Sequence, residues 1–98
     1  MPQNLNRVIS QTGTQATLNI TAATVIKAAP GVIARFNVIV AGSAAGAIHD
    51  CTTTGAAATA NKIVVLPNTV GTYAVEFVTT NGITVVPGTG QTVAVSWL

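Results

Sequence analysis

Apolar and polar residues alternate along several short stretches of this chain, and that period of two restricts what the chain can fold into. The clearest stretch is GVIARFNVIV, residues 31–40, followed by TYAVEFV at 72–78 and QTVAVSW at 91–97. Successive side chains of a β-strand point to opposite faces, so this alternation predicts strands with one buried face and one outward face. The chain is therefore expected to be built from strands.

The alternation also assigns side chains to faces. In the first stretch, the residues expected to point inward are Val32, Ala34, Phe36, Val38 and Val40, and those expected to point outward are Ile33, Arg35, Asn37 and Ile39. In the second stretch, the inward residues are Tyr73, Val75 and Phe77, and the outward residues are Thr72, Ala74 and Glu76. In the third stretch, the inward residues are Val93, Val95 and Trp97, and the outward residues are Thr92, Ala94 and Ser96.

Further strands and turns complete this pattern. TLNI and TVIK predict strands between residues 15 and 29, AIHDCT predicts one at 47–52, and KIVVLP predicts one at 62–67. Helix signals are nearly absent, because glycines interrupt the alanine-rich stretches. The turn signals between the strands are Pro30-Gly31, Gly42-Ser43, Pro67-Asn68, Asn81-Gly82 and Pro87-Gly88. About eight short strands with such turns predict an all-β fold, an antiparallel β-sandwich for which a jelly roll is one arrangement.

The chain has 98 residues, enough for one domain. Residues 1–10, MPQNLNRVIS, are expected to form a flexible N-terminal arm, and residues 11–98 the single sandwich domain. The first residues contain no apolar core of a signal peptide, and no apolar run reaches the length of a membrane helix. We therefore expect a protein that is made in a cytoplasm and does not enter a membrane.

Charge is scarce. Four Lys or Arg and two Asp or Glu make up 6% of the chain, whereas about 25% is usual. Monomeric proteins use charged surfaces to stay soluble and unassociated, so a neutral surface predicts a subunit of a larger assembly. The four cations are dispersed, and nucleic-acid binding would need them clustered. No nucleic-acid partner is predicted.

The stretch PGTGQT, residues 87–92, looks like part of a phosphate-binding loop. Such a loop needs the pattern GxxxxGK[ST] between a strand and a helix. Here Gln91 follows Gly90, and the residues after it alternate like a strand. We therefore predict a turn, with residues 85–86 and 93–95 forming a β-hairpin closed by residues 87–90.

Few residues are available for chemistry. His49 and Cys51 are the only residues of their kinds, and residues two apart on a strand share a face, so a Cys–His nucleophile pair is conceivable. A loop or edge-strand histidine beside a small buried cysteine is the favoured interpretation. Metal binding would lack ligands other than Glu76. Asp50 and Glu76 could act as the two carboxylates of a hydrolase only if the fold brings them together. The favoured interpretation is that they are two separate surface charges. No catalytic, metal or cofactor site is predicted, and the chain is not expected to be an enzyme.

The candidate partner-contact residues lie at the two ends of the chain. Arg7 belongs to the predicted arm, which is expected to contact a partner. Trp97 and Leu98 form an apolar pair that either closes the core or anchors a neighbouring subunit. Trp97 continues the inward face of Val93 and Val95, which favours the core.

Three longer stretches resemble known proteins. They are ATLNITAATVIKAAPGVIARFNVIVAGSAAGAIHD, NKIVVLPNTVGTYAVEF and GITVVPGTGQTVAVSW, within residues 16–97, with PNTVG and VVPGTGQTVAVS as the most specific pieces. They resemble small structural proteins of tailed bacteriophages, such as capsid decoration (cement) proteins and other virion surface proteins. The resemblance implies a virion component without enzymatic activity, working as a homotrimer on the capsid and contacting the major capsid protein.

Two other classes of function remain open. A fibre, spike or tail-tip module would bind a host surface receptor or glycan, and such sites need exposed aromatic rings beside carboxylates or amides in a concave patch. The four aromatic residues are Phe36, Tyr73, Phe77 and Trp97. Their expected burial counts against this class. A small enzyme is the third class, and it would have one histidine, one cysteine and two carboxylates to work with.

Overall fold

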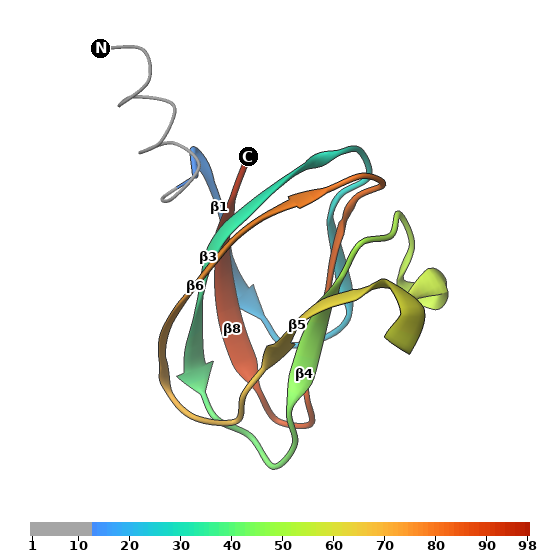
Figure 1. Ribbon diagram of the computed structural model, residues 1–98. Coiled ribbons are helices and arrows are strands. Elements are labelled where there is room, and N and C mark those ends of the chain that lie inside the picture. Colours follow the sequence, from blue (N-terminus) through green and yellow to red (C-terminus); the bar gives the residue numbers. More distant parts are fainter. Residues whose placement is uncertain (1–12) are drawn as a thin grey trace, which may run out of the picture.

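The computed structural model describes residues 13–98 (Figure 1). The predicted N-terminal arm, with Arg7, lies outside the described residues. The strands are β1 (Gln15–Ile20), β2 (Thr24–Lys27), β3 (Gly31–Val40), β4 (Gly46–His49), β5 (Lys62–Leu66), β6 (Gly71–Thr79), β7 (Ile83–Val86) and β8 (Thr92–Trp97). Two single-turn 3-10 helices, η1 (Thr54–Ala56) and η2 (Thr59–Asn61), lie between β4 and β5. Within residues 13–98, no helix is long and apolar enough to span a membrane.

The strands form two four-stranded sheets. Sheet A has the order β1-β8-β3-β6, and sheet B has the order β2-β7-β4-β5. The pairing is nested and antiparallel, because β1 pairs with β8, β2 with β7, β3 with β6 and β4 with β5. The chain is thus one long ribbon of strand pairs wrapped into two facing sheets, which is the connectivity of a jelly roll. The predicted all-β antiparallel sandwich is confirmed.

The hydrophobic core lies between the two sheets. Sheet A contributes Phe36, Val38, Val93 and Val95, which confirms the inward face predicted for these residues. The Phe36 ring stacks on Tyr73, with ring centroids 4.9 Å apart. Sheet B contributes Ile48, Leu66, Ile83 and Val85.

The strict alternation predicted for residues 31–40 is wrong at its two ends. Ile33 is fully buried, whereas 49% of Val40 is exposed. The register of β3 shifts between Ile33 and Arg35 against both neighbours, and again between Val38 and Val40 against β8. An irregularity of this kind changes which face the following side chains occupy, and the sequence pattern carries no sign of it.

The prediction that Phe77 is buried is also wrong, since 53% of this side chain is exposed. Between the pairs Ile33–Phe77 and Arg35–Ala74, β6 contains one residue more than β3. Glu76 lies in this bulge with a φ of +53°, in the left-handed region. Phe77 still shares a face with its buried partner Ile33, but β6 is the edge of its sheet, so part of the ring stays open to solvent.

The predicted hairpin between residues 85–86 and 93–95 does not form. β7 pairs with β2 and β4 in sheet B, whereas β8 pairs with β1 and β3 in sheet A. The PGTGQT stretch therefore carries the chain from one sheet to the other. It does contain the expected turn, because the Gln91 N–H donates to the Gly88 carbonyl at 3.0 Å. Glycine is required at position 88, where a Cβ would collide with the Ala44 carbonyl oxygen.

Candidate functional site

His49 lies in β4, a central strand of sheet B, so its prediction as a loop or edge-strand residue is corrected. Its imidazole is buried, and Nδ1 is 2.9 Å from both the Ala58 carbonyl oxygen and the Asn61 Oδ1. The Asn61 Oδ1 also accepts the Ala58 N–H, so both atoms facing Nδ1 are acceptors and Nδ1 carries the hydrogen. His49 thereby fastens the connection of residues 50–61 to sheet B.

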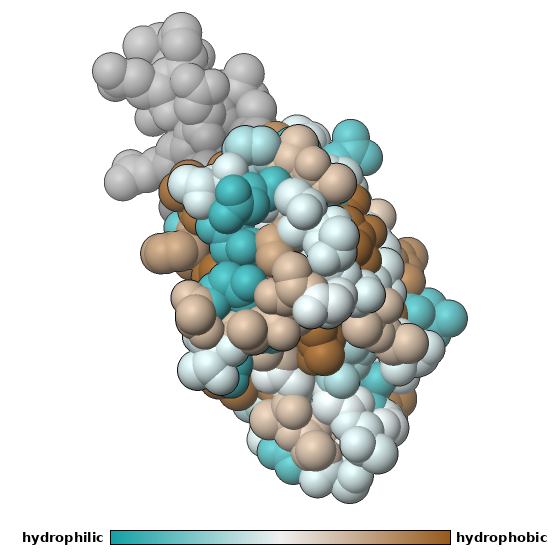
Figure 2. Space-filling view, turned by 90° about the vertical axis from the view of Figure 1, so that its right-hand side faces the viewer, coloured by the Kyte–Doolittle hydropathy of each residue, from teal (hydrophilic) through white to brown (hydrophobic). Residues whose placement is uncertain are grey.

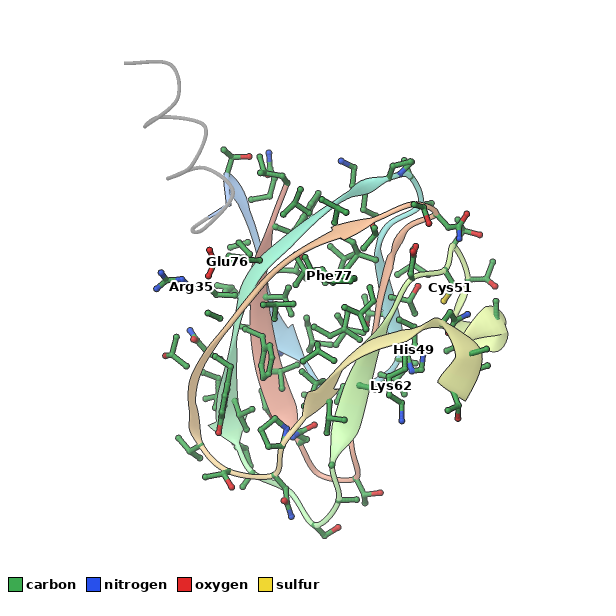
Figure 3. All side chains as sticks on the ribbon, viewed as in Figure 1. Arg35, His49, Cys51, Lys62, Glu76 and Phe77 are labelled. Atoms are coloured by element: carbon green, nitrogen blue, oxygen red, sulfur yellow. The ribbon has the colours of Figure 1, made fainter. Side chains whose placement is uncertain are left out.

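Cys51 is buried at the start of this connection (Figure 3). Among the described residues, its thiol donates to the Thr53 carbonyl at 3.3 Å rather than to His49. The Cys51 carbonyl accepts a hydrogen bond from the Thr84 hydroxyl at 3.0 Å. These contacts support a small buried cysteine, and His49 is not arranged to act as the base for this thiol.

Asp50 holds the connection between β6 and β7. One carboxylate oxygen accepts the N–H and hydroxyl of Thr80 at 3.0 and 2.9 Å, and the other accepts the N–H groups of Asn81 and Gly82 at 2.8 and 3.2 Å. Partial burial alone would raise the pKa of Asp50, but these four hydrogen bonds outweigh it and lower the pKa to about 2. The sequence analysis missed this role, for which the adjacent Asn81-Gly82 turn signal was the available hint.

The two carboxylates do not converge. Glu76 lies beside Arg35 at the left of Figure 3, whereas Asp50 follows His49, which lies at the right. Within residues 13–98, no group of three His, Cys, Asp or Glu side chains is placed to hold a metal ion. The geometry therefore supports Asp50 as a structural residue, as it does His49.

Trp97 packs against the core, which confirms the favoured interpretation of this residue. Its indole N–H donates to the Thr17 hydroxyl at 3.1 Å. Lys27 Nζ lies 5.9 Å from the centre of the indole and donates to the Leu98 carbonyl at 3.1 Å. Leu98 exchanges two backbone hydrogen bonds with Val32, at 2.9 and 3.2 Å. Both residues are thus tied into the sandwich, and a role in partner contact stays a prediction.

The outer surface of sheet A, which we call the A face, carries mostly neutral side chains from all four of its strands. Cross-strand pairing places Asn37 between Ala94 and Thr72, and Arg35 between Ser96 and Ala74. These rows are flat because most of their side chains are short. The A face comprises Ala16, Leu18, Arg35, Asn37, Ile39, Thr72, Ala74, Glu76, Ala94 and Ser96.

The A face combines a shallow depression with exposed apolar side chains. The depression has a volume of about 240 Å³ and is lined mainly by the short side chains at its centre. Leu18, at 70% exposed, and Ile39, at 54%, stand out from this surface. Arg35 and Glu76 are its only charged residues, and their formal charges cancel.

The opposite side of the molecule is covered differently. The connection of residues 50–61 lies over the outer surface of sheet B, where His49 and Lys62 are cross-strand neighbours. In Figure 2, which views the molecule from this side, pale residues of intermediate hydropathy prevail and strongly hydrophilic residues form separate small groups. This side therefore lacks the flat, open sheet surface that the A face presents.

No protein-family model matches the chain, and neither a curated protein nor a solved structure matches it. What the chain does must therefore be inferred from its own residues and surfaces. The geometry offers a nearly neutral sheet surface, and the polar residues His49 and Asp50 hold connections between strands.

Proposed function

We propose that this chain is a non-enzymatic virion structural protein that decorates and stabilises a bacteriophage capsid. It binds between subunits of the major capsid protein, as a homotrimer, on the virion surface. The observation that carries the proposal is the A face, a flat four-stranded sheet surface with two charges of opposite sign and exposed Leu18 and Ile39. On a free monomer, such a surface would promote unwanted association. On a subunit of an assembly, the same surface is buried against other protein and contributes to binding.

The chemistry of the A face sets the kind of contact it can make. Burying apolar surface contributes about 25 cal/mol per Å², and a stable interface takes about 800 Å² from each partner. Flat rows of mostly short, neutral side chains allow close approach over such an area, and Arg35 and Glu76 are the only charged A-face side chains to desolvate. The contact should then depend little on salt. Arg7, outside the described residues, stays a predicted second contact with the capsid.

Sedimentation with bacteriophage heads that lack the protein tests this proposal. The protein should sediment with the heads to the same extent in dilute buffer and in about 1 M NaCl, where the Debye length is about 3 Å. Ala94→Glu places an unpaired charge in the centre of the A face and should abolish sedimentation with the heads. Thr52→Glu, at an exposed position beyond sheet B, is the matched control and should leave it unchanged.

Two results would contradict the proposal. Release of the protein at high salt would mean that charged contacts hold it. Equal sedimentation of the Ala94→Glu and Thr52→Glu proteins would mean that the A face is not the contact. Circular dichroism of both variants establishes that each is folded.

A module that binds a host surface receptor or glycan is the second candidate, and one observation favours it. Phe77 is half exposed and lines a depression of about 360 Å³ together with Asp50 and Asn81. An exposed ring beside polar side chains suits a sugar, and jelly rolls occur among lectins as well as capsid proteins. Both oxygens of Asp50 already accept two hydrogen bonds, which leaves few polar groups for a ligand. Binding of the isolated protein to host cells, lost in Phe77→Ala, would establish this function instead.

A further inference from the structure

The His49 ring has one nitrogen that its structural role leaves unused. Nδ1 carries the hydrogen and faces the Ala58 carbonyl oxygen and the Asn61 Oδ1, both at 2.9 Å. In this neutral tautomer, Nε2 has a lone pair and accepts a hydrogen bond rather than donating one. Among residues 13–98, no donor lies within hydrogen-bond distance of Nε2. An unpaired acceptor in a side chain that is only 6% exposed is unusual and points to a ligand or a water molecule.

Nε2 opens into a depression on the outer side of sheet B. Every side-chain nitrogen or oxygen that is closed off from solvent within residues 13–98 has a hydrogen-bond partner. Nε2 has none, so it is reached by solvent. His49 lines a depression of about 320 Å³, between the outer surface of β4 and β7 and the connection of residues 50–61. The other lining residues are small or apolar, apart from Thr59 and Lys62.

Lys62 gives this depression a positive charge. It is the cross-strand neighbour of His49, the two side chains lie together at the right of Figure 3, and it is the one charged residue that lines the depression. Lys62 also borders the neighbouring depression that contains Asp50. Both oxygens of Asp50 are occupied by the hydrogen bonds from residues 80–82, and within residues 13–98 no ion pair joins Asp50 to Lys62. The ammonium group is therefore available to an anion.

The two groups together define the chemistry of the ligand. It must donate a hydrogen to Nε2 of His49, and it must present negative charge to Nζ of Lys62. Hydrogen phosphate does both, because at neutral pH it keeps one hydroxyl beside its charged oxygens. Sulfate and carboxylate groups have the charge but no hydrogen to donate at that pH.

We propose that this depression binds hydrogen phosphate, whose hydroxyl donates to His49 Nε2 while Lys62 Nζ donates to a charged oxygen. The Thr59 hydroxyl, on the same wall as Lys62, is a further donor for the anion. The site lies on sheet B, whereas the A face belongs to sheet A. Binding of the anion is therefore independent of the proposed contact with a capsid.

Nitrogen-15 NMR tests the inference directly, because His49 is the only histidine of the chain. At about pH 8, where imidazole groups are ordinarily neutral, the spectrum should show the hydrogen on Nδ1 and a bare Nε2. Addition of inorganic phosphate at constant ionic strength should shift the Nε2 resonance until it saturates. Sulfate at the same concentrations should leave this resonance in place, since it cannot donate a hydrogen.

Two substitutions at Lys62 test the second half of the site. Lys62 is exposed, so neither change disturbs the packing of sheet B. Lys62→Gln removes the charge and should raise the dissociation constant for phosphate about tenfold. Lys62→Arg keeps the charge and should bind phosphate nearly as well as the unaltered protein. Circular dichroism of both variants establishes that each is folded.

Several results would overturn the inference. A hydrogen found on Nε2 would remove the acceptor, and the absence of a saturable shift with phosphate would mean that Nε2 meets only water. Equal shifts with phosphate and sulfate would indicate a general effect of anions rather than a site that requires a hydroxyl. Equal binding of phosphate by Lys62→Gln and Lys62→Arg would mean that Lys62 does not hold the anion.

Discussion

At the scale of single residues, polar side chains hold the connections between strands. Gln91 is 1% exposed, and its Oε1 accepts the Gly88 N–H at 2.9 Å. Its Nε2 donates to the carbonyls of Leu66 and Pro67, at 3.3 and 2.9 Å, and so ties the crossing from β7 to β8 to the end of β5. Asp50 does the same for the connection from β6 to β7. Buried polar groups are tolerated because their hydrogen bonds are satisfied.

Replacement of Asp50 should weaken the fold in a pH-dependent way. Its pKa is lowered from 3.8 to about 2, so the stability that it adds is fully present above about pH 4 and is lost as the pH falls through 2. Asp50→Asn should therefore lower the free energy of unfolding by roughly 2 kcal/mol at neutral pH. The loss should be much smaller near pH 2. Urea unfolding at the two pH values measures it.

Glu76→Gln provides the control for Asp50, since it removes the other carboxylate of the chain. It should change the stability little at either pH, because surface charges contribute roughly 0–1 kcal/mol. An Asp50→Asn loss of equal size at both pH values would show that the carboxylate charge is not what stabilises the turn.

At the scale of elements, the bulge in β6 decides how this strand meets its surroundings. The additional residue at Glu76 changes the pairing with β3 from Ile33–Phe77 to Arg35–Ala74. It separates the part of β6 where Tyr73 and Val75 pack on the core from the end where Phe77 and Val78 are exposed. The same irregularity disturbs the free edge of β6. Such a disturbance protects an edge strand from pairing with strands of other molecules.

The backbone at Glu76 can be tested with two substitutions that both remove its carboxylate. A φ of +53° suits glycine and disfavours a β-branched residue, with a cost of roughly 1–2 kcal/mol. Glu76→Gly should therefore be more stable than Glu76→Val by about that amount. At Thr72, an exposed position of the same strand without a positive φ, the order should reverse, because valine favours a strand and glycine does not. Thermal unfolding of the four variants measures both differences, and the same order at the two sites would contradict the bulge.

At the scale of the whole molecule, the jelly roll places the first and last strands of the described residues side by side. β1 and β8 are neighbours in sheet A, with Gln15 opposite Trp97. β8 in turn lies between β1 and β3, so the sheet is complete only when the last strand has been added. The architecture therefore depends on pairing between residues that are distant in sequence.

Folding should accordingly be slow for a chain of this size, in the range of milliseconds to seconds. Bringing distant strands together costs loop entropy before their contacts form. Trp97 is the only tryptophan and bonds to Thr17 of β1, so its fluorescence reports this last pairing in stopped-flow refolding. Far-ultraviolet circular dichroism provides an independent signal, and refolding within microseconds would contradict the expectation.

Much of the architecture was predictable because its signals are local. Alternation and turn residues located the strands, and they placed Phe36, Val38, Val93 and Val95 correctly in the core. The scarcity of charge excluded a highly charged surface whatever the fold. It could not show where the neutral surface is continuous, because the A face joins residues from four strands that are distant in sequence.

Strand partners and bulges could not be predicted, because they depend on contacts between distant parts of the chain. Residues 85–86 and 93–95 look like a hairpin, but β7 and β8 each have two neighbours in different sheets. Ile33 and Phe77 depart from their predicted exposure because register shifts arise from hydrogen bonding with neighbouring strands. The roles of His49 and Asp50 likewise depend on acceptors and donors that the fold brings to them. Strand formation and the scarcity of charge could be predicted from the sequence, since they follow from neighbouring residues and from composition. Strand partners and open surfaces could not, since they follow from contacts between residues that are distant in sequence.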